Sequence, residues 1–284
     1  DLGPEAFLEN LLKASEKYSE FVNPSNDQVY LNSLKSMGVN KCFPLLLNAV
    51  RKVDSDGFNK LCNAIDSLTF RHSILRNDPK ELERFYYQLS EQIIGNKNID
   101  EIISKIKSHQ NFKDEEKFKS EFIQASPKSS VTKMILDRIT RIHSESIDWS
   151  NKDTHIEHIM PQKPAGEWLE LSNEDIDEYK DYLNRLGNLT VLQDKKNIRA
   201  RNKDFMHKKK YYSESRLKIT KMITEYQEWN YDQIILRQEY LYNQGKEIWK
   251  YTAPNKGYKS CRSAPRFIAK PLGFMQYCNL VKLK

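Results

Sequence analysis

The sequence predicts a mainly α-helical protein in which a short ββα unit is embedded in helices. Two observations predict the helices: apolar residues recur at spacings of three and four over much of the chain, and only 9 of the 284 residues are glycine. A third observation predicts the ββα unit. Residues 155–160 and 188–193 have the apolar, β-branched character of short strands, and a polar helix start follows the second segment.

The first 147 residues are predicted to form a helical scaffold or linker domain without a chemical motif. Proline lies near the start of several segments, where a missing amide hydrogen costs little. Ser129 or Ser130 is expected to open the last helix of this region. The predicted helices cover residues 4–22, 43–53, 56–76, 79–93, 112–125 and 129–146.

A polar stretch at residues 146–154 marks a boundary, and a second domain is predicted over 148–251, followed by a basic C-terminal extension over 252–284. Pro161 breaks the first strand of this domain. Ser172 is expected to cap a helix over 173–186, and Gly187 is expected to stop it. Asp194 is expected to cap a helix that continues from the second strand to residue 223, and another helix is predicted over 231–251.

Composition excludes several classes of protein. Charged residues make up 30% of the chain and hydrophobic residues 38%, which is typical of a soluble, folded protein. No apolar run approaches 18 residues, and the first residues lack the basic region of a signal peptide. The four cysteines form no CxxC pair, which fits a reducing cytoplasm and argues against a zinc ribbon.

Positive charge is concentrated at one end of the chain. Residues 195–284 contain 21 Lys and Arg against 7 Asp and Glu, a net charge of +14, whereas the other 194 residues carry a net charge of −7. A solvated lysine-rich surface would explain this asymmetry on its own. Because it follows the strand segments directly, we interpret it as a surface that faces the phosphates of DNA.

Residues 155–197 carry the pattern that indicates a reaction. Hydrolysis of a phosphodiester at neutral pH needs a deprotonated water, charge stabilisation on the phosphate and help for the departing oxygen. A neutral imidazole supplies the first, and His158 is the candidate general base. One Mg²⁺-like ion supplies the other two, with Glu157 and the side-chain oxygen of Asn197 as its expected ligands.

Other polar residues around this pattern have expected roles. Side chains alternate along a strand, so His155 shares a face with Glu157 and is a further candidate site residue. Asn188, at the start of the second strand, is a catalytic candidate that we expect to bond backbone in the loop and fix the position of the base. The residues expected to hold the DNA backbone are Arg199, Arg201, Lys203 and Lys208.

The blocks EHIMPQ, LGNLTVL and DKKN closely resemble the HNH-like C-terminal domain of GmrSD-type restriction enzymes, a family that includes the phosphorothioate-sensing SspE defence proteins. They also resemble the (D/E)HIxPQ…VL…KN pattern of the HNH domain in CRISPR effector nucleases. The segments FMHKKKYYSES and WNYDQIILR resemble later elements of the GmrSD family, so the resemblance covers about residues 148–251.

The resemblance implies a ββα-metal (His-Me finger) nuclease core and a metal-dependent endonuclease that nicks or cleaves foreign DNA, from phage or plasmid, in bacterial restriction. By match, Glu157 and Asn197 hold Mg²⁺ or Mn²⁺, and His158 activates water. Glu157 occupies a position where the family more commonly has Asp. The longer side chain changes how far the carboxylate extends and keeps its negative charge.

Relatives also carry an N-terminal nucleotide-sensing domain with a DGQQR motif that does not occur here. We therefore expect this chain to be a C-terminal fragment whose partner is an NTPase or sensor domain. Double-strand cleavage would need a homodimer.

The main alternative is a DNA-binding or regulatory module whose nuclease site has decayed. That alternative predicts salt-sensitive DNA binding without cleavage that EDTA inhibits. Two zinc enzymes fit less well. The H-x-E pattern that begins at His155 lacks the PCxxC of zinc deaminases, and HIEH does not have the HExxH spacing of metalloproteases.

Overall fold

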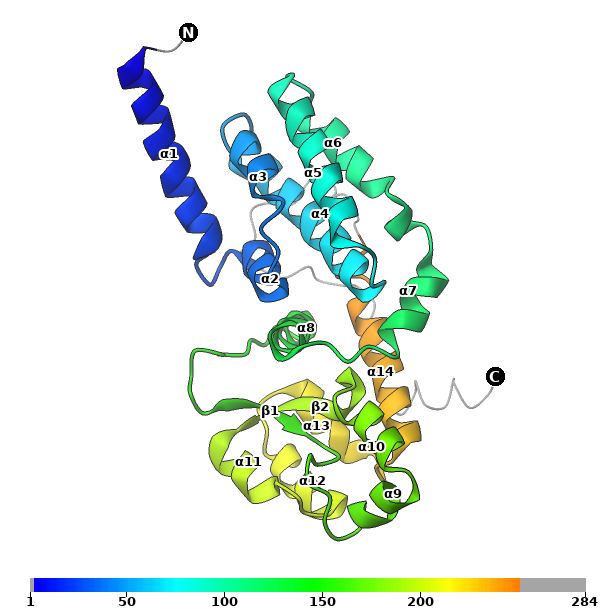
Figure 1. Cartoon of the computed structure of the whole chain (residues 1–284). Helices are drawn as coiled ribbons and strands as arrows, with labels where there is room; N and C mark the ends of the chain where they lie inside the picture. The colour runs from blue at the N-terminus through cyan, green and yellow to red at the C-terminus, as the bar shows by residue number, and fades with distance from the viewer. Residues whose placement is uncertain (1–2, 251–284) are drawn as a thin grey trace. The chain divides into compact units, whose positions relative to one another are not determined.

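The computed structural model describes residues 3–250, without the side chains of residues 194 and 195, and confirms a mainly α-helical chain with one two-stranded sheet (Figure 1). Within these residues the chain divides into two compact units, residues 3–118 with 249–250 and residues 119–248. The basic extension predicted over 252–284 lies outside the described residues. No helix in the described part of the chain is long and apolar enough to span a membrane.

The first unit is a helical bundle arranged around α4. Its elements are α1 (Pro4–Val22), α2 (Val29–Met37), α3 (Phe43–Ala49), α4 (Ser55–Ile74), α5 (Pro79–Ile94), α6 (Ile99–Lys107), the 3₁₀ helix η1 (Gln110–Phe112) and the first part of α7 (Glu115–Phe122). Helix α4 contacts α2, α3, α5 and α6. Three of the helices begin at side chains that accept hydrogen bonds from their first turns, namely Asp54, Asp78 and Asn98.

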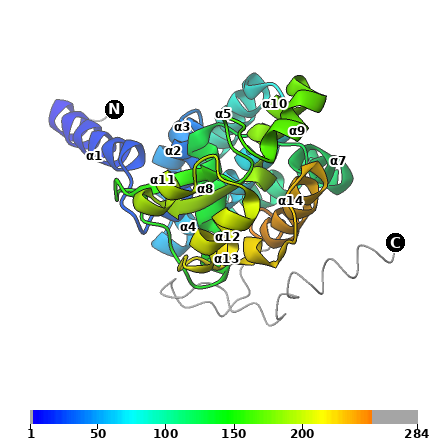
Figure 2. The same cartoon turned by 90° about the horizontal axis from the view of Figure 1, so that it is seen from below.

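Helix α1 differs from the rest of the first unit. It extends away from the other helices over much of its length (Figures 1 and 2), and Phe7, Leu8, Leu11 and Leu12 on it are exposed. Near its C-terminal end Phe21 is buried against Phe43 of α3, with 5.7 Å between ring centroids.

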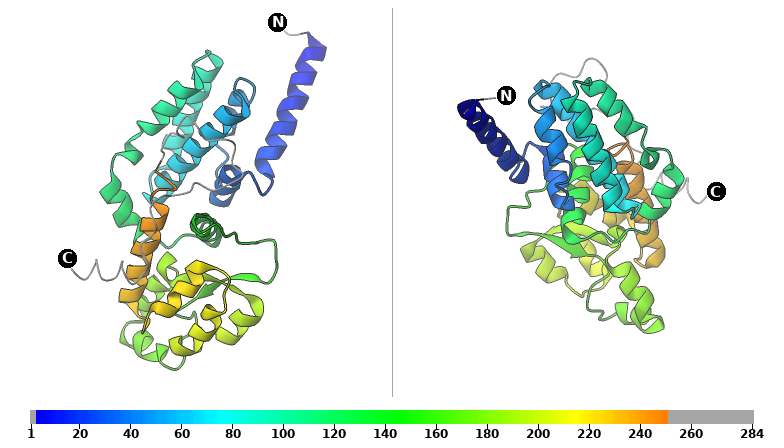
Figure 3. Two further views of the ribbon diagram at one scale, coloured as in Figure 1. Left: turned by 180° about the vertical axis from the view of Figure 1, so that it is seen from behind. Right: turned by 45° about the horizontal axis from the view of Figure 1, so that its top comes forward.

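The second unit surrounds the sheet with helices. Its elements are α8 (Ser129–Ile142), β1 (Thr154–His158), α9 (Trp168–Glu174), α10 (Ile176–Leu183), η2 (Leu186–Asn188), β2 (Leu189–Gln193), α11 (Asp194–Ala200), α12 (Phe205–Ser213), α13 (Lys218–Lys221), η3 (Met222–Glu225) and α14 (Tyr231–Gly245). Strands β1 and β2 are antiparallel, with Thr154 opposite Gln193 and His158 opposite Leu189. Helices α12 and α13 come to the front when the molecule is seen from behind (Figure 3, left).

Two helices of the second unit end earlier than the periodicity predicts. The helix predicted over 173–186 is broken at Asp175, whose carboxylate accepts hydrogen bonds from the amides of Asp177 and Glu178 and so starts α10. Ser172, the predicted cap, lies inside α9. The helix predicted from 194 to 223 is divided into α11, α12, α13 and η3. Helix α11 ends at Ala200, directly before Arg201, a residue with a positive φ of 28°.

Gly187 is not the residue that stops a helix. Helix α10 ends at Leu183, and Gly187 lies in the 3₁₀ helix η2. The backbone amide of Gly187 donates a hydrogen bond to the side chain of Gln238 on α14. A Cβ atom on Gly187 would lie 2.1 Å from the carbonyl oxygen of Ile234, so glycine is required there by the close approach of α14 and not by a left-handed conformation.

Helix α8 belongs to the second unit, where it contacts α14. The sequence-based boundary at residue 147 therefore differs from the division of the structure, which falls after Phe118. The polar stretch at residues 146–154 is a connection within the second unit and leads from α8 into β1.

Candidate active site

The candidate site lies around the two strands and α11, the helix that follows them. Strand β2 runs directly into α11, and this helix contacts both strands. The chain order strand, strand, helix is therefore also a spatial group. Glu157 and His158 lie at the end of β1, opposite Thr190 and Leu189. Helix α11, which carries Asn197, follows the other end of β2, where Gln193 lies opposite Thr154.

Glu157 points into the protein and is 4% exposed. Its Oε1 atom accepts a hydrogen bond from Lys208 Nζ at 2.8 Å and another from the Tyr212 hydroxyl at 3.1 Å. Burial raises the pKa of the Glu157 carboxyl, and the neighbouring Lys208 ammonium and Tyr212 hydroxyl act in the opposite sense. One oxygen of this carboxylate therefore accepts hydrogen bonds from two side chains of α12.

Lys208 was expected to contact DNA, and its position does not fit that role. The side chain is 0% exposed, and its ammonium donates both to Glu157 and, at 2.7 Å, to the carbonyl oxygen of His158. Phe205, Lys208 and Tyr212 lie three and four residues apart on one face of α12, and all three are buried. An ammonium without exposed surface cannot reach a phosphate unless α12 moves.

The other three residues expected to hold DNA are on the surface. Arg199, Arg201 and Lys203 are exposed on α11 and on the segment that follows it. The insertion between the strands, residues 162–185, has the opposite character, since it holds seven Asp and Glu against three Lys and Arg. Exposed basic side chains thus lie on and just after α11, whereas the insertion is acidic.

His158 lies on the face of β1 opposite to Glu157 and is half-buried. Its Nε2 atom is 3.1 Å from Oδ1 of Asn184 and 3.5 Å from the side-chain nitrogen of Gln162. Burial lowers the pKa of His158, as does the Lys208 charge, while the hydrogen bond with Asn184 raises it. The net shift of the His158 pKa is downward, which favours the neutral imidazole, the form that can accept a proton.

Asn188 is 0% exposed, and each of its side-chain hydrogen-bonding groups is used. Oδ1 accepts from the Met160 amide at 2.7 Å and from Trp229 Nε1 at 3.1 Å. Nδ2 donates to the carbonyl oxygens of Met160 at 3.0 Å and Leu183 at 2.9 Å. Asn188 therefore bonds to backbone on both sides of the insertion and has no free atom for a substrate or ion.

Helix α14 fixes the turn that carries Asn188, and the sequence contained no local signal for this. Arg237 Nη1 donates to the carbonyl oxygens of Gly187 at 2.7 Å and Leu189 at 2.8 Å, and Gln238 Oε1 accepts from the Gly187 amide at 3.0 Å. Arg237 is buried, and burial lowers its pKa to about 10. The turn is held by polar side chains from a helix that begins more than forty residues later.

Residues 109–244 match the family model described as GmrSD restriction endonucleases, C-terminal domain. This segment, the GmrSD-type domain, is similar to the C-terminal domain of those enzymes. No curated protein matches the chain. The GmrSD-type domain includes β1, β2 and α11 together with the two helices that fix them, α12 and nearly all of α14. It also includes α8, and its start at residue 109 precedes the 148–251 range of the sequence resemblance.

The remaining expected site residues lie around the sheet of the GmrSD-type domain. His155 is half-buried and faces Leu192 of β2. Asn197 is half-buried on α11, and its side chain makes no hydrogen bond to the described residues. The described part of the chain contains no group of three or more His, Cys, Asp or Glu side chains that could hold a metal ion by themselves.

The donor atoms at the site fit a hard divalent ion that keeps much of its water. Mg²⁺ is commonly held by one or two protein ligands together with water and substrate phosphate, so a three-residue cluster is not required. Glu157 Oε2 accepts no hydrogen bond from the described residues, and it is not among the fully buried atoms that lack a partner. It therefore keeps access to solvent while Oε1 is fixed from behind.

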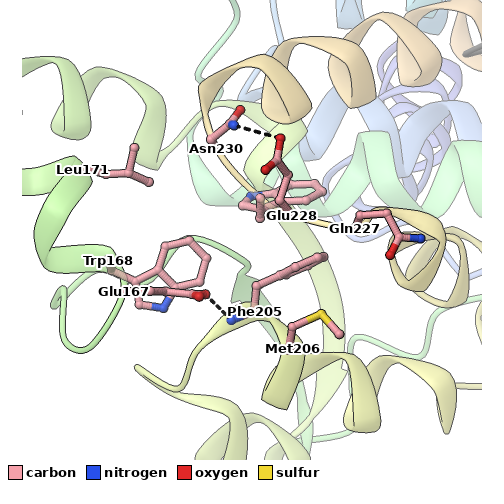
Figure 4. A pocket seen from close by; sticks show the side chains of 9 residues that line it. Glu167, Trp168, Leu171, Phe205, Met206, Gln227, Glu228 and Asn230 are labelled. Atoms are coloured by element: carbon pink, nitrogen blue, oxygen red, sulfur yellow. Dashed lines mark hydrogen bonds between the residues drawn. The ribbon is translucent and has the colours of Figure 1, made fainter.

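A separate hollow of about 220 Å³ lies between α9, α12 and the loop before α14 (Figure 4). Trp168 and Phe205 line it, and the carboxylates of Glu167 and Glu228 are directed to the Phe205 amide and the Asn230 side chain. None of the expected site residues lines this hollow. Two carboxylates among its lining residues would repel a phosphate, so this hollow is a poor site for a DNA backbone.

Proposed function

We propose that the protein is a DNA endonuclease of a restriction system and that His158 is its general base. One observation carries this proposal: a GmrSD-type domain holds a half-exposed imidazole, lowered in pKa, at the end of β1. The family consists of restriction endonucleases, so its reaction class is hydrolysis of a DNA phosphodiester. A neutral imidazole near the surface is the group that this reaction needs to take a proton from water.

We further propose that cleavage needs Mg²⁺ or Mn²⁺. Glu157, through Oε2, and Asn197, through its side-chain oxygen, would hold the ion. When bound, the ion would neutralise charge on the phosphate and help the 3′ oxygen to leave. The protein's own contribution is to keep the carboxylate fixed: Lys208 and Tyr212 bind Oε1 on the inner side, and such outer contacts orient a ligand.

DNA is proposed to lie along the side of α11. Arg199, Arg201 and Lys203 are exposed there and can each neutralise a phosphate. The acidic insertion between the strands would repel the backbone and so limit the path of the duplex. Lys208 is not part of this surface because its ammonium is buried.

The biological setting is proposed from the family. The domain would cut foreign DNA, of phage or plasmid origin and with or without modification, in bacterial defence. An NTPase or sensor domain with the DGQQR motif would be its partner, and two copies of the nuclease domain would be needed to cut both strands. Comparing plasmids with and without phosphorothioate linkages would test whether this chain senses modification by itself.

The decisive experiment incubates supercoiled plasmid with the purified chain and Mg²⁺ or Mn²⁺. We expect open-circular or linear products, and we expect EDTA and His158→Ala each to abolish them. His207→Ala is the matched control, since His207 is a half-buried histidine on α12 bonded to Tyr211 and should leave cutting intact. Cutting by His158→Ala at the wild-type rate would exclude His158 as the base.

An uncut plasmid that is nevertheless shifted on a gel would favour the alternative of a DNA-binding module. Adding the sensor domain separates that alternative from an inhibited nuclease. Cutting that appears only with the added domain would retain the proposal, and continued absence of cutting would overturn it.

A further inference from the structure

Asn184 is the residue after the last turn of α10, and no motif in the sequence marks it. Its side chain is exposed, yet its Oδ1 atom lies 3.1 Å from His158 Nε2. Of the described side chains, this is the nearest hydrogen-bonding partner of the imidazole. The contact joins the end of the insertion to the end of β1.

The chemistry of the two atoms determines where the proton lies. A side-chain amide oxygen can only accept a hydrogen bond, so His158 Nε2 must carry a hydrogen for this contact to form. A neutral imidazole has one N–H group, and the other ring nitrogen then has a free lone pair. Nδ1 is therefore the atom that can take a proton from water, and the described residues place no hydrogen bond on it.

Gln162 makes the only other contact to the ring among the described residues, and it is weaker. Its side-chain nitrogen is 3.5 Å from the same Nε2 atom. An amide NH₂ group cannot donate to a nitrogen that already carries hydrogen. Gln162 thus borders the imidazole but does not compete with Asn184 for it.

The distance between His158 and Asn184 is set by buried contacts. Asn188 binds both backbone groups of Met160, two residues after His158, and also the carbonyl oxygen of Leu183, next to Asn184. Arg237 binds the carbonyl oxygens on either side of Asn188 from α14. His158 and Asn184 therefore lie on two backbone segments that the buried side chain of Asn188 connects by hydrogen bonds.

We propose that Asn184 is the positioning residue of the catalytic imidazole: it holds His158 as the Nε2–H tautomer and directs Nδ1 toward the water that attacks the phosphate. This inference rests on the proposed role of His158 as the general base. Asn188 acts indirectly, because it holds the backbone segments of His158 and Asn184 so that the two side chains stay at hydrogen-bonding distance. Neither asparagine touches the substrate.

The tautomer can be measured without any cleavage assay. Long-range ¹H–¹⁵N correlation spectra of protein labelled with ¹⁵N-histidine distinguish the two ring nitrogens, and His158→Gln identifies the signal. We expect the Nε2–H form in the wild-type protein and a mixture of tautomers in Asn184→Ala. Asn184→Asp keeps an acceptor at the same place and should restore the single tautomer.

Plasmid cutting gives the second readout. Asn184→Ala should lower kcat by roughly 10- to 100-fold, as expected for a misplaced catalytic group, with DNA affinity unchanged. Asn184→Asp should recover most of the rate, and Gln162→Ala, the matched control on the same ring, should cut like wild type. An Nδ1–H tautomer in the wild-type protein, or an Asn184→Ala variant with wild-type tautomer and rate, would overturn the inference.

The two readouts separate this inference from the proposed function. If the wild-type protein does not cut DNA but the tautomer changes as expected, the nuclease proposal fails and the assignment of Asn184 as the partner that orients the imidazole stands. If the protein cuts and Asn184→Ala changes neither readout, the nuclease proposal stands and this inference fails.

Discussion

Lys208 Nζ and Glu157 Oε1 form an ion pair of 2.8 Å in which the lysine side chain is 0% exposed and the glutamate side chain 5%. The same ammonium binds the carbonyl oxygen of His158. Two consecutive residues of β1 are therefore attached to one side chain of α12. The pair fixes the end of the strand on which the proposed base lies.

Loss of one partner should destabilise the protein more than loss of both. Lys208→Met leaves a buried carboxylate unpaired, which we expect to lower the free energy of unfolding by about 3–5 kcal/mol. The double variant Lys208→Met/Glu157→Gln removes the uncompensated charge and should recover most of that loss. Urea unfolding measures both. Lys210→Met, on the exposed side of the same helix, is the control and should change stability by less than about 0.5 kcal/mol. Equal stability of Lys208→Met and wild type would contradict the role of the pair.

The pH dependence of cleavage should report the lowered pKa of His158. Because burial disfavours the imidazolium, the base stays neutral below its ordinary pKa of 6.5, so the acid limb of kcat/KM should be centred below 6.5. The same shift means that the unfolded chain binds the proton more tightly. The contribution of His158 to stability therefore falls as the pH drops through 6.5. A series of plasmid-cutting rates between pH 5 and 8 tests the first expectation, and an acid limb at or above 6.5 would contradict it.

Gly187→Ala should disturb the turn η2. The added methyl group would lie 2.1 Å from the Ile234 carbonyl oxygen, so the turn or α14 must shift, at a cost of at least about 1–3 kcal/mol. We expect a lower unfolding temperature and slower cutting, since the shift also moves Asn188. Gly95→Ala is the matched control, because its methyl group would meet the Glu91 carbonyl oxygen at an ordinary 3.5 Å. Similar behaviour of the two variants would exclude close packing as the reason for glycine at 187.

The salt dependence of DNA binding should identify the DNA-facing side. Removing one phosphate contact lowers the slope of log K against log salt concentration by about 0.9. We expect this change for Arg201→Ala and for Lys203→Ala, measured by fluorescence anisotropy with a labelled duplex. Lys180→Ala is the control, because Lys180 is exposed on the acidic insertion and paired with Asp177. An unchanged slope for both test variants would place the DNA elsewhere.

Much of the fold was predictable because amphipathic spacing and capping residues act locally. Helices α1, α4 and α5 were predicted to within one or two residues of their bounds, and both strands were found. The breaks in the second unit were missed for a different reason. Residues 173–186 have a continuous helical pattern, and only the side chain of Asp175, bonded to two amides, ends one helix and starts the next.

The site was less predictable than the fold because its supports come from distant residues. The run Lys208-Lys209-Lys210 looks like a solvated basic face, and only the spacing of Phe205, Lys208 and Tyr212 indicates that one lysine turns inward. No pattern near the strands indicates that Arg237 binds the turn. Asn184 was missed as well, since an exposed asparagine after a helix is ordinary in sequence.

The side chain of Asn188 connects the two ends of the insertion between the strands by hydrogen bonds. Asn188 joins Met160 to Leu183, so the intervening 22 residues leave the fold and return to it at neighbouring points. Such a segment can change in length or composition without altering the spacing of the two strands. Substrate preference could then change through the insertion while the residues that cut DNA are kept. Exchanging residues 163–182 between relatives would therefore transfer substrate preference without transferring the cutting residues.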